Sequence, residues 1–298
     1  MSRDARGSAP SGLVVVDKPG GLTSHDVVAR IRRLAGTRRV GHAGTLDPMA
    51  TGVLVVGVEK ATRLLGHLTL TDKEYQATIR LGQATDTGDA EGTVTGGRPA
   101  GQLSLAQVQA AAAALTGEIQ QVPPTVSAIK VAGRRAYQLT REGAPPVLKP
   151  RPVTVWSFTV QAVQPASGDL LDVAVEVRCS SGTYVRALAR DMGEALGVGG
   201  HLTRLRRTRV GPYDLSAAHT LDELAAGLTV LPLAEAAAAA FPARELTADE
   251  ASSLSHGGRL AGAGAETGPV AAFGPDGRLI ALVQETDGVA RPLAVFVS

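Results

Sequence analysis

The sequence contains few of the residues that disulfide, metal or membrane structures require. Its 298 residues include a single cysteine, Cys179, which excludes an intramolecular disulfide and a cysteine-rich zinc site. None of the six histidines forms a His-x-x-x-His pair, a common arrangement of metal ligands on a helix. No apolar run approaches the ~20 residues that a membrane-spanning helix needs. We therefore expect a cytoplasmic protein that uses no metal, no other cofactor and no membrane.

Aromatic residues and net charge are also scarce. Aromatic side chains make up 3 % of the chain and the formal net charge is +2, so bulk composition does not indicate a polyanionic ligand. The cations are nevertheless clustered, with few acidic residues among them, near residues 30–39, 130–151 and 204–209. Each cluster is either a solvated surface or a surface that contacts phosphates and releases their counterions. Composition leaves both interpretations open.

Composition also divides the chain into regions. Residues 1–12 lack an apolar core, which indicates a disordered tail and not a signal peptide. Residues 13–242 form the expected main domain, with a basic, partly extended insert at about 121–153 in which Tyr137 lies among cations. Residues 243–298 contain the hairpin signal Gly274-Pro275-Asp276-Gly277, so we expect a small C-terminal β-rich domain there.

Hydrophobic periodicity predicts the elements of the main domain. Strand patterns, either continuous apolar runs or strict alternation, occupy residues 13–16, 53–58, 74–81 and 171–179. Helical spacing begins at Thr23 or Ser24 and stops at Gly36, and a second helix begins at the capping box Ser104-x-x-Gln107.

Two polar segments between these elements allow more than one interpretation. Residues 82–97 predict a long turn, in which Asp86-Thr87-Gly88 forms an Asx-type turn. The same triplet occurs in aspartic proteases, but a second copy and the expected apolar flanks are missing from the sequence. Residues 201–209 contain four arginines within six positions and predict a strand that carries its cations on one side.

The loop at residues 40–54 is the most distinctive segment: Val-Gly-His-Ala-Gly-Thr-Leu-Asp-Pro-Met-Ala-Thr-Gly-Val-Leu. Its three glycines permit tight turns and close approach of a ligand to the backbone. Pro48 fixes its own φ and moves Asp47 out of the helical region, so the carboxylate occupies a stiff corner. A surface turn is the ordinary interpretation of Asp-Pro, but the neighbouring His42 favours a functional site.

This loop resembles the catalytic motif of the TruB family of tRNA pseudouridine synthases. Five further segments resemble the remaining motifs of the family in the same order: Asp17-Lys18-Pro19, residues 73–86, residues 123–130, residues 182–186 and residues 201–207. The resemblance covers about residues 13–215. It implies conversion of the T-loop uridine at position 55 of tRNA to pseudouridine.

The resemblance implies roles for individual residues. Asp47 would be the catalytic aspartate, acting either as a nucleophile at C1′ or as a base at C2′. Tyr75 would stack on the uracil near C5, and Arg186 would pair with the ionised Asp47 and oppose the rise of its pKa on burial. His42 would fill the space that the flipped base leaves in the T-loop. The implied substrate-binding residues are His42, Tyr184, Leu205, Lys18, Lys130, Arg206 and Arg207, of which Lys18 and Lys130 would support the loop and the RNA.

The implied fold is the α+β pseudouridine synthase fold, with a mixed, largely antiparallel central sheet, flanking helices and a small PUA-like C-terminal domain. Val126 departs from the family pattern, because many relatives carry an aromatic residue at that position. The implied partner is tRNA through its T-arm, bound by a monomer without an obligatory protein partner. Two alternatives remain: a catalytically silent tRNA-binding or RNA-folding protein on this scaffold, and a guide-RNA-dependent synthase.

Overall fold

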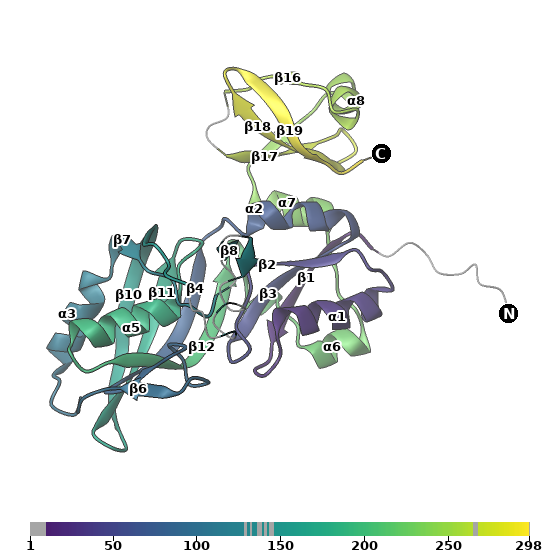
Figure 1. Ribbon diagram of the computed structural model, residues 1–298. Coiled ribbons are helices and arrows are strands. Elements are labelled where there is room, and N and C mark those ends of the chain that lie inside the picture. The colour runs from purple at the N-terminus through teal and green to yellow at the C-terminus, as the bar shows by residue number, and fades with distance from the viewer. Residues whose placement is uncertain are drawn as a thin grey trace. The chain divides into compact units, whose positions relative to one another are not determined.

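The computed structural model describes residues 10–127, 130–131, 133–135, 139, 142, 146–264 and 268–297 (Figure 1). Backbone contacts divide the chain into two units. Unit 1 contains Met1–Pro48, Gly52–Thr71 and Val210–Ser298, and unit 2 contains Met49–Thr51 and Asp72–Arg209. Of the expected disordered tail, residues 1–9 lie outside the described residues, and Gly12 already belongs to the first strand.

The first sheet of unit 1 is built around one buried strand. β1 (Gly12–Lys18) lies between β14 (Leu231–Pro232) and β3 (Thr51–Val58), antiparallel to both, and β2 (Val40–Ala43) also pairs with β3. The side chains of β1 are buried on both faces of the sheet, which explains the continuous apolar run in this part of the sequence. The register sets Lys18 opposite Gly52, so the end of β1 lies beside the start of β3.

Before its C-terminal sheet, unit 1 contains the helices α1 (Ser24–Ala35), α2 (Leu65–Leu68), α6 (Leu221–Ala226) and α7 (Leu233–Ala240), with short 3-10 turns at Glu59–Arg63 and Leu215–Ala217. The predicted ends of α1 are confirmed. Thr23 caps its N-terminus in a capping box with Asp26, and Gly36 ends it with φ 65°, a left-handed conformation that favours glycine.

The C-terminal part of unit 1 forms a five-stranded sheet. Its strands follow the order β15 (Ala243–Glu245), β17 (Pro269–Phe273), β18 (Leu279–Thr286), β19 (Val289–Val295) and β16 (Leu260–Ala261). α8 (Ala248–Ser255) packs on this sheet. The hairpin predicted from Gly274–Gly277 is confirmed as the turn between β17 and β18, where the Gly274 N–H donates to Arg278 C=O at 3.0 Å.

The sheet of unit 2 has the order β12 (Gly200–Val210), β4 (Lys73–Leu81), β11 (Leu170–Cys179), β10 (Arg151–Ala166) and β7 (Gly117–Gln121). The pairs from β4 to β7 are antiparallel. α3 (Leu105–Ala114) packs on β10, α5 (Val185–Ala195) packs on β4, and the two helices contact each other (Figure 1). Alternate residues of β4 and β11 are buried, as their alternating sequences predict.

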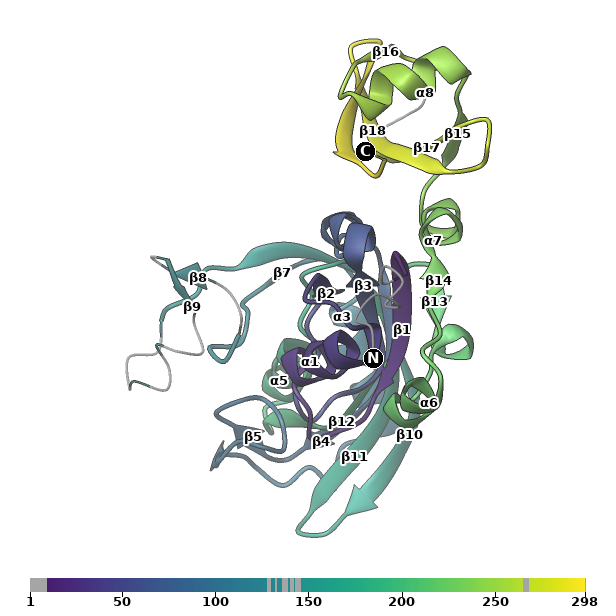
Figure 2. The same cartoon turned by 90° about the vertical axis from the view of Figure 1, so that its right-hand side faces the viewer.

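Two sequence expectations for unit 2 need correction. The segment 82–97 is not one long turn, because β5 (Ala84–Thr85) pairs with β6 (Val94–Gly96) in a short hairpin. Both ends of the basic insert at 121–153 belong to the sheet, where Gln121 of β7 pairs with Arg151 of β10. Beyond the end of β7, β8 (Lys130–Val131) pairs with β9 (Arg134–Arg135), as Figure 2 shows. Tyr137 lies outside the described residues.

Candidate active site

The Asp47 loop connects β2 to β3, and its main chain is fixed directly after Asp47. The carbonyl of Pro48 accepts hydrogen bonds from the N–H of Gly21 at 2.8 Å and from Nζ of Lys18 at 3.2 Å. Gly44 has φ 74°, which a side chain would disfavour, so the tight turn before Asp47 depends on glycine. Asp47 itself is half-buried. The stiff corner predicted from Asp-Pro is therefore tied to the segment between β1 and α1.

Lys18 at the end of β1 supports this loop through its hydrogen bond to Pro48. Its side chain is completely buried, at 0 % exposure, and Nζ also donates to the carbonyls of Pro19 at 2.9 Å and Leu22 at 2.7 Å. A buried ammonium group needs such acceptors, and three carbonyls match its three hydrogens. Because Nζ is enclosed, we assign Lys18 to the support of the loop and not to direct contact with a substrate.

His42 lies on β2 at the start of the same loop. It is half-buried, and its ring packs edge-to-face on the ring of His25, with a centroid distance of 5.6 Å and an interplanar angle of 82°. His25 comes from the first turn of α1 and was not singled out by the sequence motifs. Its position beside His42 follows from the contact between α1 and β2.

Arg186 is held deep inside unit 2 by contacts to two separate segments. It is the second residue of α5, and its guanidinium donates from Nη1 to Thr87 C=O and from Nη2 to Val126 C=O, both at 2.9 Å. Nη1 also lies 3.3 Å from Oδ2 of Asp89, and the two side chains are 5 % and 4 % exposed.

Asp89 is a charge partner that the sequence motifs did not reveal. Its Oδ1 accepts hydrogen bonds from Thr87 Oγ1 at 2.6 Å and from the N–H of Glu91 at 3.1 Å, so it is fixed within its own turn. The triplet Asp86-Thr87-Gly88 lies in a bend where the N–H of Gly88 donates to the carbonyl of Thr85 at 3.3 Å. The predicted Asx turn at Asp86 is wrong, because its Oδ1 accepts from the N–H of Thr93 at 2.8 Å, and the Asx contact belongs to Asp89. In the sequence, Asp89 directly follows the triplet Asp86-Thr87-Gly88, which is itself interpreted as a turn, and no local pattern indicates its partner. The predicted pairing of Arg186 with Asp47 stays a prediction.

Tyr184 immediately precedes α5 and is fixed through its main chain. The side-chain amide of Gln121 accepts from the N–H of Tyr184 at 2.8 Å and donates to its carbonyl at 3.2 Å. Gln121 is buried at the end of β7, whereas Tyr184 is half-buried.

β4 and β12 carry the remaining predicted residues. Tyr75 on β4 and Leu205 on β12 are both buried. Arg206 is half-buried and donates from Nη1 to Thr51 Oγ1 at 3.4 Å, whereas Arg207 is only 1 % exposed. The prediction that β12 carries its arginines on one side is therefore wrong, since neighbouring residues of a strand face opposite sides. In this state Arg207 does not present its charge to a phosphate.

The buried face of β4 also carries a second cation close to Arg207. Burial, together with the charge of Arg207, lowers the pKa of Lys73 to about 8. Opposite Lys73 on β11, burial raises the pKa of Cys179 to about 11, so its thiol remains protonated at neutral pH. Near the end of β12, Arg209 is neutralised by two carboxylates, those of Asp72 at 2.9 Å and Glu74 at 2.6 Å.

The predicted residues are thus distributed over both units. Unit 1 holds Lys18, His42 and Asp47 on one loop and its support, and unit 2 holds Tyr75, Tyr184, Leu205, Arg186, Arg206 and Arg207. Lys130 lies in β8, where it pairs with Arg135, and its side chain lies outside the described residues. Within unit 2, β4 carries the buried Tyr75 and Lys73, β12 carries the buried Arg207, and α5 carries the buried Arg186.

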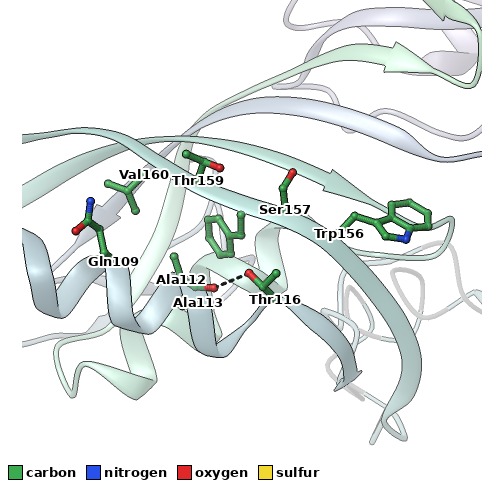
Figure 3. A pocket seen from close by; sticks show the side chains of 9 residues that line it. Gln109, Ala112, Ala113, Thr116, Trp156, Ser157, Thr159 and Val160 are labelled. Carbon is green, nitrogen blue, oxygen red and sulfur yellow. Dashed lines mark hydrogen bonds between the residues drawn. The ribbon is translucent and has the colours of Figure 1, made fainter.

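A pocket of about 530 Å³ lies elsewhere in unit 2, between α3 and β10. Figure 3 shows its lining, in which Gln109, Ala113 and Thr116 of the helix side face residues 156–160 of the strand. None of its lining side chains is an acid or a base, and none belongs to the predicted site. Trp156 at its end lies under the guanidinium of Arg178, 5.5 Å from the ring centroid. We assign no chemistry to this pocket.

The described part of the chain offers neither a metal-binding group of side chains nor a membrane-spanning helix. Within these ranges, no three His, Cys, Asp or Glu side chains are grouped so that they could hold a metal ion. The described helices include none that is long and apolar enough to cross a membrane.

Comparison with known proteins assigns the chain to a family. Residues 32–185 match the family model for the N-terminal domain of TruB family pseudouridylate synthases, and the high-identity relatives below cover nearly the whole chain. The chain belongs to the TruB family. Two C-terminal models match as well, tRNA pseudouridylate synthase B C-terminal domain at residues 186–235 and tRNA pseudouridine synthase II, C terminal, at residues 241–297.

Curated TruB relatives and solved structures both align over most of the chain. The tRNA pseudouridine synthase B of Thermobifida fusca is 62 % identical over 288 residues, which cover 96 % of this chain and 98 % of the relative. The Streptomyces coelicolor protein of the same name is 59 % identical over 295 residues and covers 97 % and 98 %. A Cbf5–Nop10–Gar1 complex contains a chain with 28 % identity and TM-score 0.74, covering 97 % of this chain and 86 % of that one. An H/ACA ribonucleoprotein bound to a substrate RNA containing 2′-deoxyuridine contains a chain with 26 % identity and TM-score 0.71, covering 96 % of this chain and 85 % of that one.

These matches confirm the predicted family and fold class. The chain has the α+β pseudouridine synthase fold, with a central sheet flanked by helices and a C-terminal β-sheet. Pseudouridine synthases are isomerases that convert uridine to pseudouridine, so the chain is an enzyme of this class. RNA binding follows from that activity.

Proposed function

We propose that this enzyme isomerises the uridine at position 55 in the T-loop of tRNA, with Asp47 as the catalytic carboxylate. The tRNA substrate is supported by relatives near 60 % identity that carry the name tRNA pseudouridine synthase B. The observation that carries the catalytic assignment is the loop itself. It presents a half-buried aspartate whose following residue, Pro48, is fixed by Lys18 and Gly21.

The reaction needs one ionised carboxylate at the sugar. The C1′–N1 bond breaks, the uracil rotates and a C1′–C5 bond forms, while C5 loses a proton and N1 gains one. Asp47 serves either as the nucleophile at C1′ or as the base at C2′. The uridine must leave the T-loop stack to reach it, which costs a few kcal/mol of unstacking.

The other predicted residues then receive roles around the flipped base. Tyr75 stacks on the uracil near C5, Tyr184 and Leu205 line the pocket, and His42 occupies the space left in the T-loop. Arg186 is the cation that keeps Asp47 ionised in a desolvated site. Arg206 contacts the RNA backbone, and Lys130 supports the RNA.

The guide-RNA-dependent alternative is less favoured. The solved complexes share 26–28 % identity with this chain, far below the roughly 60 % of the tRNA-specific relatives. We therefore propose a cytoplasmic enzyme that recognises the T-arm directly, as a monomer without an obligatory protein partner.

Release of tritium from 5-tritiated uridine in an isolated T-arm RNA tests both the chemistry and the independence from a guide. Wild type should release tritium with no other RNA or protein present, and Asp47→Ala should release none while its affinity for the RNA stays within a few-fold. Asp276→Ala, which removes an exposed carboxylate from the C-terminal hairpin, is the matched control and should retain turnover. Turnover by Asp47→Ala, or a requirement for added guide RNA, would overturn the proposal.

A further inference from the structure

Ser24 fixes the main chain directly before Asp47. The serine is 1 % exposed, and its hydroxyl makes two hydrogen bonds to one residue of the catalytic loop. Oγ accepts from the N–H of Leu46 at 2.9 Å and donates to the carbonyl of Leu46 at 3.1 Å. Leu46 is also buried, so water does not replace either bond. The two residues are 22 positions apart in the sequence.

The two bonds act on two different peptide planes. The N–H of Leu46 belongs to the plane that joins Thr45 to Leu46, and its carbonyl belongs to the plane that joins Leu46 to Asp47. One oxygen that holds both planes limits rotation about Leu46 and fixes the peptide from which Asp47 begins. On the other side, Pro48 has a fixed φ and its carbonyl is held by Lys18 and Gly21. Asp47 therefore lies between two fixed peptides.

Ser24 is not needed to start its own helix. Thr23 is the N-cap of α1: its hydroxyl accepts from the N–H of Asp26 at 3.1 Å, and the Asp26 carboxylate in turn accepts from Thr23 N–H at 2.9 Å. The Ser24 hydroxyl adds nothing to this capping box. Adjacent residues thus divide two tasks, since Thr23 bonds only within the helix and Ser24 bonds to the loop.

We infer that Ser24 is a positioning residue that sets the direction of the Asp47 carboxylate without contacting the substrate. The inference rests on the proposed catalytic role of Asp47. A carboxylate that attacks or deprotonates a sugar must be within a few tenths of an ångström of its working position, and an error of 1 Å can cost 100-fold in rate. Loss of the hydroxyl leaves the Pro48 side of the loop fixed and frees the Leu46 side.

Ser24→Ala and Thr23→Ala form a matched pair for the test, assayed on T-arm RNA at a temperature where both are folded by circular dichroism. Each should lower Tm by a few degrees, because each loses buried or capping hydrogen bonds. Ser24→Ala should lower kcat about 10- to 100-fold with KM within twofold, whereas Thr23→Ala should keep kcat within twofold of wild type. Ser24→Cys, with a weaker donor of similar size, should give an intermediate kcat and guards against misfolding of the alanine variant.

Three outcomes would refute the positioning role. The first is an equal loss of kcat in both alanine variants, and the second is a kcat of Ser24→Ala within twofold of wild type. The third is a rise in KM with no fall in kcat, since that places the serine in RNA binding. These results are separable from failure of the proposed function. An active Asp47→Ala removes the catalytic assignment, whereas an inactive Asp47→Ala with a fully active Ser24→Ala removes only the role of Ser24.

Discussion

Replacement of Arg186 by lysine probes the buried ion pair most directly. The guanidinium reaches three acceptors on two segments of unit 2: the carbonyl of Thr87 and the carboxylate of Asp89 in one turn, and the carbonyl of Val126 in another segment. Its two terminal nitrogens point in different directions, which lets one side chain serve all three. A lysine presents its hydrogens from a single nitrogen on a flexible stem and cannot reproduce this fork.

The structure sets the expected magnitude. With side-chain exposures of 5 % for Arg186 and 4 % for Asp89, solvent cannot replace a lost bond. Each buried acceptor left without a donor costs about 1–3 kcal/mol, and complete loss of one partner of a buried ion pair costs about 3–5 kcal/mol. Lysine keeps the charge and satisfies one or two of the three acceptors. We therefore expect Arg186→Lys to lower the free energy of unfolding by about 2–4 kcal/mol.

Two measurements check this expectation. Urea unfolding gives the stability difference, and tritium release from T-arm RNA gives kcat, which should fall more than RNA affinity because the planar fork is also needed in the proposed site. Asp89→Asn is the companion variant, since it keeps the shape of the partner and removes its charge. A free energy of unfolding of Arg186→Lys within about 0.5 kcal/mol of wild type would show that the three contacts are not jointly required.

Two further predictions concern the cations of β4 and β12. Arg206→Ala should lower the slope of log binding constant against log salt concentration by about one unit. Arg207→Met changes a buried position, so it should destabilise the fold and leave this slope unchanged. A change of slope in Arg207→Met would contradict the assignment of Arg207 to the core. Burial lowers the pKa of Lys73 from 10.5 to about 8, so between these pH values the unfolded chain binds more protons at Lys73, and the contribution of Lys73 to stability should rise by about 3 kcal/mol. Urea unfolding from pH 8 to 10.5 measures this rise as the difference between wild type and Lys73→Met, because the opposite titration of Cys179 is common to both proteins. A difference that stays constant over this pH range would refute the prediction.

Local patterns predicted most of the fold because they depend on neighbouring residues. The alternation at 74–81 follows from one buried and one open face of a strand, and the limits of α1 follow from the capping side chain of Thr23 and the left-handed Gly36. Asp89 could not be found in this way. It meets Arg186 across 97 positions of sequence, and nothing near either residue indicates the other. Such pairs arise only when the sheet brings β4, α5 and the intervening turn together.

The error at β12 was avoidable from the sequence. In a strand, residues 204 and 206 share one face and residues 207 and 209 share the other, so four arginines at these positions cannot form a single basic surface. Arg209 is neutralised by two carboxylates, and Arg207 is enclosed beside Lys73. The face of β12 that carries Arg204 and Arg206 is therefore the one to which we assign the proposed contact of Arg206 with RNA.

The departure of Val126 from the family pattern also has a structural answer. The resemblance to the family implies an aromatic ring at this position, and Val126 cannot make the contact that such a ring would make. In this chain the carbonyl of Val126 accepts a hydrogen bond from Nη2 of Arg186 at 2.9 Å. A main-chain acceptor is supplied by any residue, so substitution of the side chain leaves this contact intact. The segment thus contributes to the site through its backbone. In the same way, Lys18 of the Asp17-Lys18-Pro19 motif donates to main-chain carbonyls, including that of Pro48. Main-chain acceptors thus help to hold the side chains of both Lys18 and Arg186 in place.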